Sequence, residues 1–189
     1  MSTSTIERFE TARMICERVR FDQAPEHLRL LLDRRVSSTL WPRRESPTEA
    51  QILDGVLAKV EHWERHGFGM WLLRDRQTGE MVGRGGLQYT FTAGLNDVEA
   101  GWAIVPERWG QGLATELANA CVEVGFEQLE LREIIAFTLP TNIGSRRVME
   151  KAGFQFDRDI VHAGLPHVLY RRRPEPWTGV VSDGSGPPD

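Results

Sequence analysis

The segment at 96–139 constrains the fold of this chain more than any other stretch. It opens with the apolar run NDVEAGWAIV (96–105), turns through ERWGQG, continues as an amphipathic stretch at 113–129 and ends in LREIIAFTL (131–139). A strand, a helix and a second strand in this order predict a right-handed crossover unit with parallel strands. The first strand is apolar on both alternating faces apart from Glu99, which predicts a central strand covered on both sides.

Hairpins and helices are expected on either side of this unit. Apolar periodicity and turn residues predict strands at 12–20, 68–75 and 80–91, helices at 24–35, 46–67 and 142–153, and a closing hairpin at 154–173. The helix at 46–67 is expected to begin with Ser46 as its N-cap, Pro47 and Glu49, and to end at Gly67. These elements predict an α/β (α+β) domain with a mixed, mostly antiparallel central sheet of about seven strands flanked by about four helices.

Length and composition limit the class of protein. The 189 residues suffice for one domain, which we expect at 1–173 with a Pro/Gly-rich tail at 174–189. The formal net charge of −4 argues against a nucleic-acid partner. A polar N-terminus and the lack of a ~20-residue apolar run predict neither a signal peptide nor a membrane segment. Cys16 and Cys121 are far apart, which favours neither a disulfide framework nor a zinc site. We therefore expect a cytoplasmic protein.

Two glycines, Gly110 and Gly112, lie between the central strand and the following helix. Unpaired N–H groups and the helix dipole favour an anion at such a place, although a tight strand-to-helix connection is an equally good interpretation of the glycines alone. A P-loop is excluded because no lysine follows Gly112. A dinucleotide fingerprint is weak because Thr115 stands at its third glycine and no repeated βαβ units surround it.

Four segments in the correct order resemble the GNAT superfamily of acyl-CoA-dependent N-acyltransferases. They are ETARMICERV (10–19), TGEMVGRGGL (78–87), VEAGWAIVPERWGQGLATE (98–116) and NIGSRRVMEKAGF (142–154). The match is closest to the RimJ/RimL-like branch, which acetylates protein N-termini and assorted small amines. Trp109 stands where the superfamily's usual motif has arginine or glutamine, and that branch often carries an aromatic residue there. The resemblance implies the GNAT fold, acetyl-CoA as co-substrate and a primary amine as acceptor.

The resemblance also implies which residues hold acetyl-CoA. The pantetheine arm would bond to the strand backbone at Ile104 and Val105, and to the amide of Asn142. The pyrophosphate would be wrapped by the N–H groups of Gly110, Gln111, Gly112, Ala114 and Thr115. Arg108 and Arg146 are nearby cations that could reach the phosphates of coenzyme A, and a plain solvated arginine is an equal alternative for each.

The chemistry requires few side chains. Glu99 is the candidate general base, because it is the only acid in an apolar strand and burial would raise its pKa toward neutrality. A purely structural carboxylate is the alternative, and Asp97 is a weaker candidate base. Many superfamily members carry a tyrosine at the position of Met149, which cannot donate a proton. Ser145 could hydrogen-bond the leaving sulfur instead, or be an ordinary polar residue of a first helical turn. Backbone N–H groups of the central strand could stabilise the oxyanion.

The acceptor is not fixed by these motifs. Trp41 and Tyr89 are expected to line its pocket, whereas Trp71 and Trp102 fit core packing better. A protein N-terminus, an amino sugar, a polyamine and an antibiotic all remain open. No metal is expected, and relatives often dimerise, so a homodimer is one expected assembly. A catalytically silent acyl-CoA-binding module and a Rossmann-like nucleotide binder are the alternative functions.

Overall fold

The computed structural model describes residues 6–41, 46–92 and 95–174. Its strands form one eight-stranded sheet in the order β1-β2-β3-β4-β5-β6-β8-β7. The strands are β1 (Arg8–Glu10), β2 (Met14–Arg18), β3 (Met70–Asp75), β4 (Met81–Thr92), β5 (Leu95–Ile104), β6 (Ile134–Thr138), β7 (Gln155–His162) and β8 (Leu165–Arg172). Among these described strands, only β5 and β6 pair in parallel. The mixed, mostly antiparallel sheet and its crossover unit are therefore confirmed.

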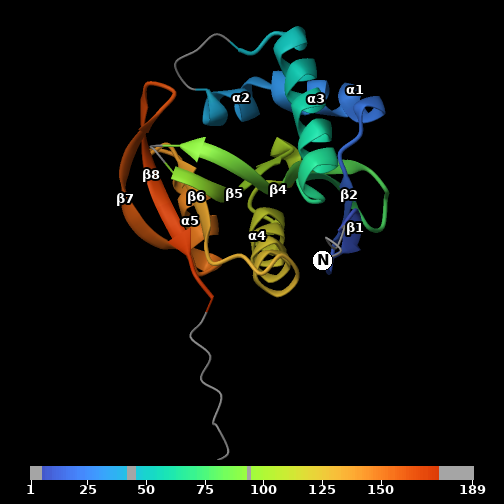
Figure 1. Cartoon of the computed structure of the whole chain (residues 1–189). Coiled ribbons are helices and arrows are strands. Elements are labelled where there is room, and N and C mark those ends of the chain that lie inside the picture. The colour runs from blue at the N-terminus through green and yellow to red at the C-terminus, as the bar shows by residue number, and fades with distance from the viewer. Residues whose placement is uncertain (1–5, 42–45, 93–94, 175–189) are drawn as a thin grey trace, which may run out of the picture.

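Helices cover both faces of the sheet. Those in the described part of the chain are α1 (Ala24–Leu32), α2 (Arg34–Leu40), α3 (Glu49–His66), α4 (Leu113–Glu123) and α5 (Ile143–Lys151). Figure 1 shows α1, α2 and α3 on one face and α4 and α5 on the other. A π-helical turn, Val124–Gln128, follows α4 directly. The helix expected at 113–129 is thus one α-helix with a widened last turn.

The described residues form one strand and one helix more than the expected seven strands and four helices. The short β1 pairs with β2 at the sheet edge, and its three residues are too few to give a periodic signal. The single helix expected at 24–35 is divided at Asp33, whose backbone is extended (ψ 119°). The Asp33 carboxylate accepts from the N–H of Arg35 at 2.8 Å and so begins α2 as a new helix.

The start of α3 also differs from the expectation. Thr48, not Ser46, is the N-cap: its hydroxyl accepts from the N–H of Gln51 at 3.3 Å, and the Gln51 side chain accepts from the N–H of Thr48 at 2.9 Å. The structure therefore uses the Thr48/Gln51 capping box in place of the Ser46/Glu49 pair of the same spacing, and α3 begins at Glu49. The end at Gly67 is confirmed, with a left-handed φ of 72°.

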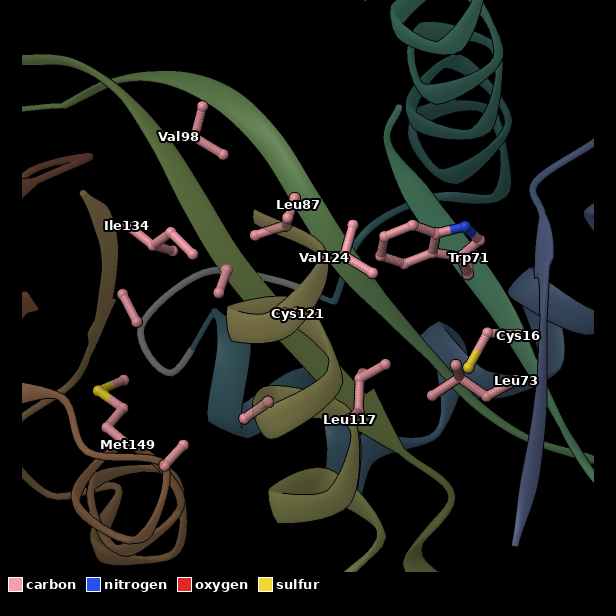
Figure 2. Close-up of a cluster of buried hydrophobic side chains, with 14 of the residues drawn as sticks. Cys16, Trp71, Leu73, Leu87, Val98, Leu117, Cys121, Val124, Ile134 and Met149 are labelled. Carbon is pink, nitrogen blue, oxygen red and sulfur yellow. The ribbon is translucent and has the colours of Figure 1, made fainter. Parts of the chain in front are cut away.

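The largest core cluster lies between α4 and the sheet. Figure 2 shows Leu117 and Cys121 of α4 in this cluster with Trp71 and Leu87 of the strands. The predicted burial of Trp71 is confirmed, and it is fully buried. Close approach of α4 requires Gly85 of β4, where an added Cβ would lie 2.5 Å from a Leu117 methyl. Both cysteines are free and buried, and burial raises the pKa of Cys16 to about 12.

The ends of the chain leave two expectations open. The tail expected at 174–189 lies outside the described residues beyond Pro174, and the domain boundary at 173 stays a prediction. Among the residues that are described, no helix is both long and apolar enough to cross a membrane.

Candidate functional site

A cavity opens where the two parallel strands of the sheet separate. Strands β5 and β6 share a single register pair, Glu99 with Ile135, while β5 continues to Ile104 paired only with β4. Backbone groups alternate in direction along a strand. The N–H of Val105 donates to Val82 of β4 at 2.9 Å, so the backbone groups of Trp102 and Ile104 face the open side. The cavity has a volume of about 960 Å³ and is lined by residues of β4 and β5, the glycine turn, α4, α5, the end of β6, and α2 and α3.

The glycine turn forms one end of this cavity. Gly110 and Gly112 have φ of 76° and 82°, a region that residues with a side chain rarely adopt. An added Cβ on Gly110 would meet no atom within 4 Å, so conformation, not space, requires glycine there. In the first turn of α4 the Glu116 N–H bonds to Gly112, which leaves the N–H groups of Leu113, Ala114 and Thr115 without intrahelical partners. Such a turn suits an anion.

The turn is fixed from outside by a segment that sequence reasoning missed. Arg13 donates to the carbonyl of Gln111 at 2.7 Å and to the carboxylate of Glu116 at 2.7 Å. The hydroxyl of Thr11 and the N–H of Arg13 donate to the same carboxylate at 2.6 and 2.8 Å. The loop between β1 and β2 therefore holds both the turn and the first turn of α4 in place. No motif signals these contacts, because they join residues about a hundred positions apart.

Removing the Glu116 charge should destabilise the protein at neutral pH. Burial alone would raise the pKa of Glu116, but the hydrogen bonds from Thr11 and Arg13 outweigh it and lower the pKa. The folded state thus gains stability when this group is ionised, and loses it as the pH falls through the lowered pKa. We expect Glu116→Gln to lower the free energy of unfolding by about 1–2 kcal/mol at pH ~7, with a smaller difference below pH ~4.

Urea unfolding at both pH values measures this effect. Glu123→Gln is the matched control, because it removes one carboxylate from an exposed position of the same helix. Equal stabilities of wild type and Glu116→Gln at neutral pH would show that these hydrogen bonds contribute nothing.

Both predicted phosphate-binding cations are held within the fold. Arg108 lines the cavity, but it donates to Asp75 at 2.8 Å and to the Gln111 side chain at 2.8 Å. Arg146 lies outside the lining and donates to Tyr170 and to the carbonyl of Pro140, each at 3.3 Å. Their roles stay predictions.

Trp109 connects the glycine turn to the end of β5. The indole N–H of Trp109 donates to the carbonyl of Ile104 at 2.7 Å. Ile104 lines the cavity, whereas Val105 does not and uses its N–H to bind β4. Of these two predicted pantetheine contacts, only Ile104 is therefore placed to make one.

Helix α5 supplies the opposite wall. Asn142 caps the helix by accepting from the N–H of Ser145 at 3.1 Å, so its amide NH₂ remains for a ligand. Both residues line the cavity, as does the buried Met149. The cations that this helix brings to the lining are Arg147 and Lys151. Sequence reasoning chose Arg146, which lies four residues after Asn142 and so on its side of the helix, but the structure places its neighbour Arg147 in the lining.

Glu99 lies on the face of the sheet that α1, α2 and α3 cover. It stands opposite Gln88 of β4, whose amide donates to it at 3.4 Å. A Cβ added at Gly101 would lie 3.6 Å from the Glu99 carboxylate and 3.2 Å from the Met70 methyl. Burial raises the pKa of Glu99 to about 7, against the Gln88 hydrogen bond and the charges of Lys59 and Arg84. This direction agrees with the sequence prediction. Asp97, the weaker candidate base, lies 3.6 Å from Arg171 and outside the cavity lining.

The two aromatic residues expected at the acceptor are separated. Trp41 lines a second cavity, of about 570 Å³, on the α1–α3 side. Tyr89 is 44% exposed and packs against His62, His66 and Phe68, outside both cavities. Trp102, expected in the core, is partly buried and lines the first cavity.

The histidines of the last hairpin do not complete a metal site among the described residues. The His162 and His167 rings are in edge-to-face contact with centroids 5.4 Å apart. The described residues contain no group of three or more histidine, cysteine or acidic side chains that could hold a metal ion.

Comparison with known proteins identifies the family. Residues 13–155, most of the chain, match the family model described as acetyltransferase (GNAT) domain. The chain belongs to the GNAT acetyltransferase family. The uncharacterised protein YkkB of Bacillus subtilis is 31% identical over 108 residues, which cover 57% of this chain and 63% of that protein. The chain spans less than two thirds of the length of the curated relatives that it matches.

Solved structures share the GNAT fold. An acetyltransferase from Agrobacterium tumefaciens superposes with a TM-score of 0.78 at 20% identity, covering 92% of this chain and 98% of its own. RimL, a ribosomal L7/L12 α-N-protein acetyltransferase solved with coenzyme A, gives a TM-score of 0.72 at 17% identity, covering 88% and 98%. These neighbours have the fold expected for the RimJ/RimL-like branch.

Proposed function

We propose that this GNAT protein transfers an acetyl group from acetyl-CoA to a primary amine by direct attack in a ternary complex. The observation that carries this proposal is one cavity that joins the glycine turn, the open side of β5 and Glu99. The turn provides N–H groups for a pyrophosphate, the strand provides backbone groups for an extended arm, and Glu99 provides a base near neutrality.

The chain's own groups account for each step. Bound along β5, the thioester would present its carbonyl to N–H groups of the open strand edge, which stabilise the oxyanion formed when the amine attacks. Glu99 accepts the proton of the attacking nitrogen, directly or through water. The C–S bond then breaks and the thiolate leaves. Asn142 and Ser145, which line the same wall, can hydrogen-bond the sulfur.

A thiol-release assay tests the proposal. Protein is incubated with acetyl-CoA and a panel of amines and peptide N-termini, and coenzyme A thiol and acetylated product are measured together. We expect equal amounts of the two with at least one acceptor. NAD serves as the comparison ligand in a thermal-shift assay: stabilisation by NAD and none by coenzyme A would contradict the assignment.

A catalytically silent acyl-CoA-binding module is the second candidate. It is favoured by Met149, which offers no proton to the leaving sulfur. Tight acetyl-CoA binding without turnover on any amine would support this module. Thiolate leaves without help, however, so we regard the enzyme as the better conclusion.

A further inference from the structure

Two basic side chains that form no close ion pair among the described residues lie at the junction of the two cavities. Arg84 of β4 and Lys59 of α3 line both the large cavity and the second cavity. In the described part of the chain neither makes an ion pair within 4 Å, and Glu99 is the carboxylate that both feel electrostatically from farther away. The Lys59 ammonium donates to the carbonyl of Gly55 at 3.3 Å, and the buried Nε of Arg84 has no hydrogen-bond partner. An enclosed charge without a partner is costly, so it is normally paired or ligand-bound.

A third polar side chain at this place is also unsatisfied. His27 of α1 lines the second cavity, is 1% exposed, and has no hydrogen-bond partner at either ring nitrogen. Burial and the nearby charges of Arg84 and Lys59 lower its pKa to about 3, so the ring is neutral and offers one N–H donor. Among the residues that the structure describes, no aspartate or glutamate lines the second cavity.

The junction lies on the same face of the sheet as Glu99. Arg84 stands opposite Ala103, and Gln88 stands opposite Glu99, so all four share one face of β4 and β5. Four residues along a strand span about 13 Å. The side chains of Arg84 and Glu99 are long, so their charged groups can lie closer together than their Cα atoms. One small molecule can therefore place an amine at Glu99 and a second group at Arg84.

We propose that the acceptor carries an anionic group, a carboxylate or a phosphate, in addition to its amine, and that Arg84 and Lys59 hold this group. This inference rests on the proposed acetyl transfer. The fork of a guanidinium matches both kinds of anion. The same two cations repel a polycation, so polyamines and aminoglycosides are expected to be poor acceptors.

Calorimetry with coenzyme A bound tests this, because no turnover can occur without the acetyl group. The probes are matched pairs: amino acids against their amides for the carboxylate, and phosphoethanolamine against ethanolamine for the phosphate. We expect at least one anionic member to bind about tenfold or more tightly than its neutral partner, a difference of ~1.4 kcal/mol. Which pair responds identifies the anion. A panel in which no anionic member is preferred overturns the proposal.

Variants of Arg84 and Lys59 test whether the preference for anionic ligands arises at this junction. Arg84→Gln should abolish the preference and Arg84→Lys should keep part of it, whereas Arg29→Gln, at an exposed position of α1, should leave it unchanged. Lys59→Gln provides a second test should Arg84→Gln fail to fold. An intact preference in both Arg84→Gln and Lys59→Gln overturns the inference. Variants that lose coenzyme A affinity but keep the preference overturn it as well. Turnover of neutral and anionic amines alike would leave the acetyl transfer standing and remove only this inference.

Discussion

Gly112→Glu is expected to abolish coenzyme A binding. The residue sits at the N-terminus of α4 with a φ of 82°, so any side chain strains the backbone there by about 1–2 kcal/mol. A Cβ itself would meet only an Arg13 nitrogen at 3.5 Å, an ordinary contact. The larger effect is electrostatic, because the carboxylate would stand where the helix N-terminus favours an anionic ligand. We expect the affinity for coenzyme A to fall by about 100-fold or more, or ~2.7 kcal/mol, in a calorimetric titration.

A variant of a second glycine distinguishes the effect of backbone strain from an effect at the coenzyme A site. Gly164, in the turn between β7 and β8, has a φ of 76° and open space around it. Gly164→Glu therefore introduces the same charge and a similar strain away from the cavity, and should keep wild-type affinity. Equal affinities of Gly112→Glu and wild type would mean that the pyrophosphate binds elsewhere.

Glu99→Gln is expected to lower turnover strongly while leaving coenzyme A affinity unchanged. Loss of a general base typically costs about 10²–10⁴-fold in rate. Wild-type kcat/KM should rise with pH through a midpoint near the Glu99 pKa of about 7, because only the carboxylate accepts a proton. This limb should disappear in Glu99→Gln. Unchanged turnover across the pH range would remove Glu99 as the base.

Two controls keep the pH profile interpretable. Asp97→Asn changes another acid of β5 that is near Arg171 and outside the cavity, and should retain turnover. Burial also lowers the pKa of Lys59 to about 7, so Lys59 could cause a limb in the same range. The limb should persist in Lys59→Gln. Its loss there would assign the titration to the lysine instead.

The same pKa shift predicts how Glu99 affects stability. A carboxyl whose folded pKa is raised binds its proton more tightly in the folded state, so its ionisation destabilises the fold. The free energy of unfolding should therefore fall as the pH rises from ~4.5, the ordinary value, toward 7, the Glu99 value. In Glu99→Gln this part of the fall should be absent.

The parts of the structure that local patterns determine could be predicted from the sequence. The glycine turn, the central β5 and the acid within it each carry a signal in a few neighbouring residues, and family motifs added the expectation that Asn142 binds the pantetheine arm. The division of the first helix at Asp33 and the Thr48 cap depended on choices between competing local signals, which the sequence does not rank.

The rest of the site depends on tertiary assembly. In the sequence, Arg84 is one polar residue among glycines, and Lys59 belongs to an amphipathic helix. Neither pattern indicates a binding site. The two residues meet only because β4 pairs with β5 in a particular register and α3 packs over that face. The anchoring of the turn by Arg13 is equally non-local. Hydrophobic periodicity reports which face is buried, not which polar residues meet across it.

A crystal structure with coenzyme A bound tests the central claim most directly. We expect the pyrophosphate on the N–H groups of 110–115, the pantetheine arm along the open side of β5, and the sulfur beside Asn142, with Glu99 and Arg84 lining the space beyond it. A pyrophosphate bound away from the glycine turn, or a sulfur remote from Glu99, would contradict it.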